Sequence, residues 1–253
     1  MTVCKERVEQ SFTRAASTYE DFTFFQKQCA EDFAALLRSR PDTAPSRILE
    51  AGCGTGLLTR YLRTLYPSAA IFSTDLSAGM IAFCRSRFAE ENMLRFACHD
   101  FDHAYEETGF DLAVSSLSLQ WSSNLPGALG NLARALKEKG EMLISIPLSS
   151  SLSQMYEIFR RYGMEYHGLE LPEKETVKKA LLIDFELVES EIRTYRESYP
   201  SFHALLKAMR MNGTSGGHSG TPPSVLKALF RECGTKPFPV TYEVGFFRGK
   251  KRT

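Results

Sequence analysis

Apolar and polar positions follow two regular patterns along the chain, which together predict an α/β fold. From residue 47 to residue 147, short apolar runs bounded by turn residues alternate with segments whose apolar residues recur at helical spacing. This order is typical of βαβ units that stack into a parallel sheet. It predicts strands at 47–51, 70–74, 94–98, 112–116 and 141–146, and helices at 57–66, 78–90 and 125–137, the last ending in the KEKG turn at Gly140.

Amphipathic segments flank this core on both sides. Helices predicted at 3–16 and 22–39 precede it and are joined to it by a linker at 41–46 that contains Pro and Ser. We therefore expect residues 1–45 to form a helical lid and residues 46–253 to form the main domain. After the core, the pattern predicts helices at 152–162, 173–181, 201–211 and 223–233, strands at 185–195 and 240–247, a loop at 212–224 and a solvated basic tail at 249–253.

Composition and charge narrow the class of protein. A chain of 253 residues can bury a core without a disulfide or a metal. The net charge is +1 with 24% charged residues, so no overall field selects nucleic acid or an anionic membrane, and we expect neither as a partner. The first residues carry charges where a signal peptide needs an apolar segment, and no run approaches the ~20 apolar residues of a membrane span. The sequence therefore predicts a cytoplasmic protein.

The spacing of cysteine and histidine does not indicate a metal site. The segment HDFDH, residues 99–103, offers two imidazoles and two carboxylates, but strand alternation and the following loop are expected to spread these groups apart. The cysteines form no CxxC pair, and we expect them to be reduced thiols. They are Cys4, Cys29, Cys53, Cys84, Cys98 and Cys233.

A glycine-rich loop, EAGCGTG, lies between the first predicted strand and the next helix. Gly52, Gly54 and Gly56 leave room for a ligand to lie against the backbone. Dinucleotide-binding enzymes also place glycines here, but their GxGxxG spacing needs a third glycine or alanine, and this chain has Leu57 or Thr59 at that position. Glu50, just before the loop, is an acid suited to cationic groups on a ligand rather than to phosphates.

Together with the acid Asp75 at the end of the next strand, this loop resembles that of the Rossmann-like, class I S-adenosylmethionine (SAM)-dependent methyltransferases. The resemblance implies SAM as cofactor and a seven-stranded, mostly parallel sheet with helices on both faces. It also implies that the glycines line the methionine part, that Asp75 binds the ribose hydroxyls, and that Asp100 and Phe101 meet the adenine, although each acid taken singly is also an ordinary turn cap. The implied cofactor-binding residues are Glu50, Gly52, Gly54, Gly56, Asp75, Leu76, Asp100, Phe101 and Ser116.

Segments outside the loop resemble one family of these enzymes, the malonyl-carrier-protein O-methyltransferases of biotin synthesis. They are SFTRAASTYEDFTFFQKQCA, SSLSLQWSSNLPGALGNLARALKEKGEM, LKAMRMNGTS and PVTYEVGFF, which together extend from Phe12 to Phe247. The resemblance implies transfer of the SAM methyl group to the free carboxylate of malonyl on acyl carrier protein, with malonyl-coenzyme A as a possible second acceptor. The resulting methyl ester primes pimeloyl synthesis. Because a carboxylate of pKa ~4 is already ionised at neutral pH, no catalytic base is needed.

The residue that holds the malonyl carboxylate stays open among several candidates. An arginine fork matches a carboxylate, and Arg14, Arg160, Arg161 and Arg210 are candidates for it, the middle two being preferred. Neutral donors from the resembling segments are Tyr19 and Gln120, while Trp121 either borders the acceptor or plugs the core. The predicted catalytic residues are Tyr19, Gln120, Arg160 and Arg161, and the basic docking candidates are Lys174, Lys178 and Lys179, or Lys207 with Arg210, unless these are merely solvated faces.

Two other functions remain compatible with the same cofactor loop. The first is methylation of a free small acid such as trans-aconitate, because the core of these enzymes does not determine the substrate. The second is a non-catalytic SAM-binding module that regulates or scaffolds a partner. A nicotinamide-dependent dehydrogenase is disfavoured by the glycine spacing.

Overall fold

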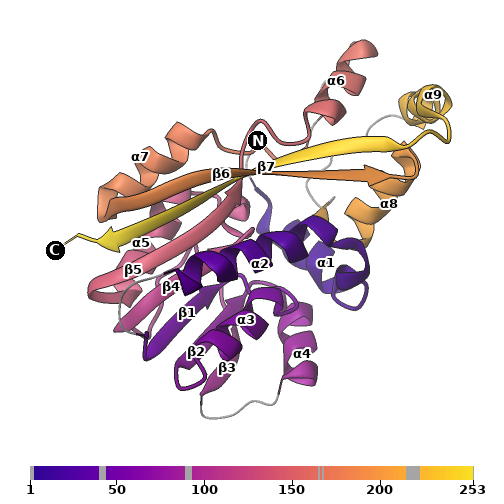
Figure 1. Cartoon of the computed structure of the whole chain (residues 1–253). Coiled ribbons are helices and arrows are strands. Elements are labelled where there is room, and N and C mark those ends of the chain that lie inside the picture. Colours follow the sequence, from indigo (N-terminus) through magenta and orange to yellow (C-terminus); the bar gives the residue numbers. More distant parts are fainter. Residues whose placement is uncertain are drawn as a thin grey trace.

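A single twisted sheet organises the computed structural model, which describes residues 3–39, 44–88, 93–164, 166, 168–214 and 223–252. Its seven strands have the order β3-β2-β1-β4-β5-β7-β6 (Figure 1). The first five are parallel, and β7 lies antiparallel between β5 and β6. The predicted α/β fold with a seven-stranded, mostly parallel sheet is confirmed. The strands are β1 (Arg47–Ala51), β2 (Ala70–Asp75), β3 (Leu94–Cys98), β4 (Phe110–Ser116), β5 (Leu136–Pro147), β6 (Phe185–Tyr199) and β7 (Phe238–Lys251).

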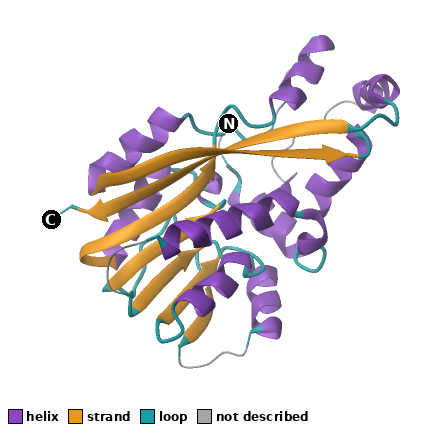
Figure 2. Ribbon diagram, in the orientation of Figure 1, coloured by secondary structure: helices purple, strands orange, loops and turns teal. Residues whose placement is uncertain are grey.

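Helices cover both faces of the sheet (Figure 2). Strand residues therefore meet apolar partners on both sides: in β1, Ile48 packs into the cluster formed with α2, α3 and α4, whereas Leu49 packs into the cluster formed with α5 and α7. The helices are α1 (Lys5–Ala15), α2 (Phe24–Arg38), α3 (Leu57–Leu65), α4 (Ala78–Arg87), α5 (Leu125–Ala135), α6 (Ser153–Arg161), α7 (Lys174–Asp184), α8 (Phe202–Met211) and α9 (Pro223–Cys233), with short 3₁₀ turns η1 (Tyr19–Phe22) and η2 (Leu119–Trp121).

The junction between α5 and β5 differs from the sequence-based prediction. The helix ends at Ala135, and β5 already begins at Leu136, so the KEKG segment belongs to the strand and is not the end of the helix. The ladder to β4 is irregular here: Leu136 pairs with Phe110 and Glu141 with Leu112, which leaves Lys139 at a φ of 59°. The charged residues of KEKG can lie in a strand because strand pairing uses backbone groups. The side chains of residues 137–139 face solvent.

The C-terminal basic segment is also a strand rather than a solvated tail. Lys250 pairs with Glu141 of β5 and Glu186 of β6, and Lys251 pairs with Phe185 of β6. The Nζ of Lys251 also donates to the carbonyl oxygen of Leu136 at 2.7 Å. The predicted strands at 185–195 and 240–247 are correspondingly longer in the structure. Backbone pairing between β6 and β7 extends both strands beyond the apolar stretches that predicted them.

The β6–β7 hairpin runs past the rest of the sheet and carries a second layer of structure. Its ladder extends to the pair Tyr199 with Phe238, whereas β5 accompanies β7 only as far as Val244. Around the far end lie α6, α8 and α9 (Figure 1), which share a separate apolar cluster that includes Phe159, Phe202 and Leu229. This end of the molecule forms one wall of the cavity described below.

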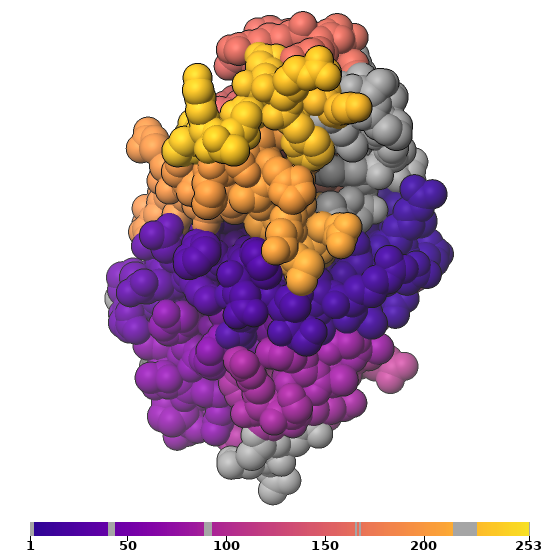
Figure 3. Space-filling view, turned by 90° about the vertical axis from the view of Figure 1, so that its right-hand side faces the viewer, coloured from indigo at the N-terminus to yellow at the C-terminus, as the bar shows by residue number. Residues whose placement is uncertain are grey.

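The N-terminal helices pack against the main domain. Thr13 of α1 and Ser77 share a hydrogen bond of 2.8 Å, and a Cβ at Gly79 would lie 2.8 Å from the Cα of Thr13, so the two backbones meet closely. Figure 3 shows the N-terminal segment as a band between the helices of the first strands and the C-terminal hairpin. The predicted loop at 212–224 lies mostly outside the described residues, and among the described helices none has the length and apolar character needed to cross a membrane.

Candidate functional site

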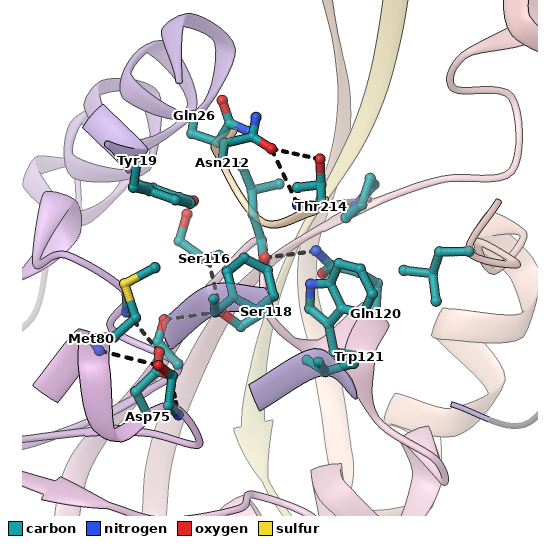
Figure 4. Close-up of a pocket in the computed structure, with 18 of the residues that line it drawn as sticks. Tyr19, Gln26, Asp75, Met80, Ser116, Ser118, Gln120, Trp121, Asn212 and Thr214 are labelled. Carbon is teal, nitrogen blue, oxygen red and sulfur yellow. Dashed lines mark hydrogen bonds between the residues drawn. The ribbon is translucent and has the colours of Figure 1, made fainter. Parts of the chain in front are cut away.

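A cavity opens where the parallel strands end, the place at which open α/β sheets bind ligands. The strand ends contribute Glu50, Asp75 and Ser116 to its lining. Tyr19 comes from the N-terminal segment and Asn212 from the end of α8 (Figure 4). Five segments that are distant in sequence therefore enclose one space.

The three glycines of the loop have different roles, although each has a positive φ. A Cβ at Gly52 would lie 2.2 Å from the Oγ of Ser118, and one at Gly56 would lie 2.5 Å from the ring of Phe88. A Cβ at Gly54 would meet no protein atom within 4 Å, because it would point into open space. Gly52 and Gly54 line the cavity, so the clearance at Gly54 is available to a ligand, whereas Gly52 and Gly56 accommodate the protein itself.

Asp75 ties the loop to the following helix. Its carboxylate accepts hydrogen bonds from the backbone N–H groups of Gly54 and Ser77, both at 2.8 Å. Burial raises the pKa of Asp75, although these two backbone bonds favour its ionised form. The residue is thus a turn cap and also part of the cavity lining, together with its neighbour Leu76.

Glu50 lies beneath the loop with only 1% of its surface exposed. The hydroxyl groups of Ser73 and Thr59 donate to its Oε2 at 2.6 and 2.7 Å. Burial raises the pKa of Glu50 to about 7 despite these hydrogen bonds. Its charge therefore responds to conditions near neutral pH, which few carboxylates do.

This shift predicts a pH-dependent stability. The folded protein keeps the Glu50 proton to a higher pH than the unfolded chain, whose carboxyl has the ordinary pKa of 4.5, so the free energy of unfolding should fall by about 3 kcal/mol from pH 4.5 to 7. Glu50→Gln should remove this contribution. Denaturant titrations of both proteins at several pH values test it, and equal pH profiles would contradict it.

Of the two residues expected to bind the adenine, Phe101 lines the cavity and Asp100 does not. Phe101 lines the cavity and is buried, and its carbonyl oxygen accepts a hydrogen bond of 2.9 Å from Asn131 Nδ2. Asp100 lies outside the lining, and its carboxylate pairs with the Nζ of Lys5 at 2.8 Å. Lys5 lines the cavity and also pairs with Asp102 at 2.9 Å. Sequence reasoning missed Lys5, whose charge resembled any other on an amphipathic helix.

The HDFDH segment therefore uses its carboxylates to hold α1. Among the described residues, no group of three or more His, Cys, Asp or Glu side chains is arranged to hold a metal ion. His99 instead shares a 3.2 Å contact with the carbonyl oxygen of His103.

Neutral polar and aromatic side chains from the N-terminal segment and from η2 also line the cavity (Figure 4). Tyr19 and Gln120 both line the cavity, as does Trp121, whose ring meets Phe12 of α1 edge-on at 5.5 Å. Burial and the negative charge of Asp75 raise the pKa of Tyr19, so its hydroxyl is neutral at physiological pH. The Nε2 of Gln120 donates to the carbonyl oxygen of Leu117 at 2.7 Å. Trp121 thus borders the cavity and is also packed in the core.

Three further lining residues were not singled out from the sequence: Gln26, Asn212 and Thr214. Asn212 is buried, donates to the carbonyl oxygen of Phe22 at 3.1 Å and accepts from the Thr214 hydroxyl at 2.7 Å. Asn212 therefore links the end of α8 to the N-terminal segment. The sequence could not show this link, because nothing in the local sequence distinguishes Asn212 from a linker residue. It depends on a contact between segments 190 residues apart.

The arginines expected to hold a substrate carboxylate lie outside the cavity lining. Helix α6 turns Met155, Ile158 and Phe159 inward, which leaves Arg160 and Arg161 exposed on the other face. Arg161 pairs there with Glu157 at 2.6 Å. The other two candidates, Arg14 and Arg210, are also exposed and do not line the cavity. The placement of Arg160 and Arg161 at the substrate is therefore corrected.

Comparisons with known proteins indicate the class of enzyme. A family model described as a methyltransferase domain matches residues 49–144. Malonyl-[acyl-carrier protein] O-methyltransferases from Magnetococcus marinus and Bacillus cereus are 29% and 28% identical, covering 95% and 90% of this chain and 92% and 88% of their own lengths. The structure of the N-methyltransferase NodS from Bradyrhizobium japonicum, in complex with S-adenosyl-L-homocysteine, superposes with a TM-score of 0.59 at 15% identity, covering 98% of this chain and all of NodS. These findings confirm the expected fold, SAM as the cofactor, and the class of enzyme, a SAM-dependent methyltransferase.

Proposed function

We propose that this enzyme transfers the methyl group of SAM to the free carboxylate of malonyl on acyl carrier protein. The observation that carries the proposal is the similarity to relatives of that name along nearly their whole length. It includes the N-terminal segment and the region of α8, which supply Tyr19 and Asn212 to the acceptor side of the cavity. These regions lie outside the methyltransferase-domain match, so they bear on the substrate rather than only on the cofactor.

Residues on the cofactor side are suited to hold SAM. Gly54 leaves space at the loop, while Asp75 offers a carboxylate for the ribose and Phe101 an aromatic wall for the adenine. When bound, SAM supplies an electrophilic methyl group on a positively charged sulfur. The buried carboxyl of Glu50 beneath the loop suits that positive charge.

The acceptor side fits a nucleophile that is already ionised. Among the described lining residues the basic side chain is Lys5, and it is paired with Asp100 and Asp102 at 2.8 and 2.9 Å. The side chains left for a carboxylate are neutral, with Tyr19 and Gln26 among them. A neutral donor orients a carboxylate without the tight charge pairing that would lower its nucleophilicity. Catalysis then rests on alignment, which can contribute on the order of 7 to 11 kcal/mol.

Toward α6, the residues that line the cavity are largely apolar and include Leu152, Tyr156, Leu169 and Leu171. We propose that the thioester arm enters along this side and that α1 and α2 close the site from water as a lid. A carrier protein is acidic, so the exposed basic side chain of Arg160, one turn beyond Tyr156, is suited to its docking. Malonyl-coenzyme A as a second acceptor and a cytoplasmic location are part of the same proposal.

Methyl transfer from labelled SAM to malonyl-carrier protein, malonyl-coenzyme A and free acids including trans-aconitate tests the function. We expect the highest kcat/KM with malonyl-carrier protein. A preference for a free acid would overturn the carrier-protein assignment. SAM binding without turnover of any acceptor would favour a non-catalytic role, and a variant unable to bind SAM is the control for background transfer.

A further inference from the structure

The side-chain amide of Gln120 is hydrogen-bonded within the protein at one end only. Its Nε2 donates to the carbonyl oxygen of Leu117 at 2.7 Å, and this contact fixes which end of the amide is the oxygen. The remaining atom, Oε1, is buried on the cavity lining and has no hydrogen-bond partner among the described residues. Because a buried acceptor without a partner costs stability, this oxygen points to a donor that a ligand supplies.

Gln154 of α6 shows how the chain pairs a glutamine that supports the fold. Its Nε2 donates to the Thr241 hydroxyl at 2.9 Å, and its Oε1 accepts from the Thr241 backbone N–H at 3.1 Å. Gln154 does not line the cavity. Of the described buried side-chain atoms without a partner, two belong to cavity-lining residues, and Thr55 carries a hydroxyl, which can donate as well as accept. Gln120 Oε1 can only accept.

An amide oxygen restricts the part of a ligand that can bind it. A malonyl thioester offers only acceptor oxygens, so Gln120 Oε1 would repel its carboxylate rather than hold it. SAM carries donors at its hydroxyl and ammonium groups, but the carboxyl groups of Asp75 and Glu50 on the same lining are stronger acceptors for them. The arm of an acyl carrier is pantetheine, whose amide N–H groups begin a short methylene chain away from the thioester sulfur. Such an N–H is the donor left for Gln120.

Gln120 lies on the side of the cavity where that arm is proposed to enter. Figure 4 shows Gln120 and Trp121 across the cavity from Asp75. Trp121 belongs to the same apolar cluster as Leu169, which lines the cavity toward α6. An amide that enters between apolar side chains loses its water, so an acceptor on the wall is needed to keep its N–H paired.

We infer that Gln120 Oε1 accepts a hydrogen bond from the pantetheine amide N–H nearest the thioester of the methyl acceptor. Gln120 is thus a specificity-determining residue that favours malonyl on a pantetheine arm over free acids, and it acts as an acceptor rather than as the neutral donor expected from sequence. The inference rests on the proposed function, because it requires a malonyl thioester as the substrate.

Two small malonyl thioesters that differ in one group test the inference. S-Malonyl-N-acetylcysteamine carries the amide N–H, and the S-malonyl thioester of mercaptoethyl acetate has an oxygen atom in its place. The wild-type kcat/KM for methyl transfer should be about 10-fold higher with the amide, the equivalent of one hydrogen bond. Gln120→Met keeps the length of the side chain and removes its oxygen. It should lose this preference and keep the wild-type affinity for S-adenosylhomocysteine.

Gln154→Met is the matched control, because it removes a glutamine that is paired at both ends and lies outside the cavity lining. It should lower the melting temperature and keep the preference for the amide. Equal wild-type kcat/KM for the two thioesters would overturn the inference, whether or not the variants fold. A preference that persists in Gln120→Met would also overturn it, as would a loss of S-adenosylhomocysteine affinity there, which would assign the oxygen to the cofactor. If neither these thioesters nor malonyl-carrier protein were methylated, the proposed function itself would fail, and the inference with it.

Discussion

Gly54→Val is expected to abolish SAM binding while the chain stays folded. A Cβ at this position meets no protein atom within 4 Å, so the branched side chain would occupy the space left for the cofactor. Its φ of +55° also strains a β-branched residue, and this should lower the melting temperature modestly. Calorimetry with S-adenosylhomocysteine should detect no binding, and circular dichroism should show the wild-type spectrum.

Gly234→Val provides a matched control for the backbone strain. Gly234 has the same φ of +55° and equally open surroundings, but it follows α9 and does not line the cavity. The control should show a similar loss of stability with wild-type affinity for the cofactor. Wild-type affinity in a folded Gly54→Val protein would contradict the position of the cofactor at this loop.

Asp75→Ala should weaken SAM binding by about 100-fold or more. The substitution removes the proposed acceptor for the ribose hydroxyls. It also removes the two hydrogen bonds of 2.8 Å that hold the N–H groups of Gly54 and Ser77. Hydrogen bonds to charged groups contribute about 1.5 to 3 kcal/mol each, and losing two of them gives an effect of this size. Equilibrium binding of S-adenosylhomocysteine measures it.

Asp111→Ala is a control that removes a carboxylate bound to backbone N–H groups but leaves the cavity lining intact. Asp111 also binds backbone N–H groups at the start of a strand, those of Ser46 and Arg47, both at 2.8 Å, but it does not line the cavity. Its replacement should lower the melting temperature and leave cofactor affinity nearly unchanged. If Asp75→Ala lost no more affinity than Asp111→Ala, the ribose role of Asp75 would be wrong.

Buried elements of the fold were the most predictable from sequence. The bounds of β1 and β3 agree with the prediction, since each is a short run enclosed by turn residues. Strand β1 is almost wholly buried inside the sheet, and β3, at the sheet edge, keeps Leu94 and Phe96 buried. The errors came where backbone pairing overrode side-chain pattern. The polar side chains of KEKG predicted the end of a helix, and those of the C-terminal lysines predicted a solvated tail. Both segments instead belong to strands, which pair with β4 and β6 respectively.

The sequence by itself determined the cofactor loop, because its function depends on residue types within a few positions: glycines at positive φ and acids at adjacent strand ends. Tertiary structure alone decided the part of the cavity that we propose for the acceptor. Tyr19, Gln120 and Asn212 come together there from three distant segments, while the packing of α6 turned Arg160 and Arg161 away from the cavity. A local pattern specifies backbone conformation, but which side chains face a shared space depends on how the hairpin and the N-terminal helices pack against the sheet.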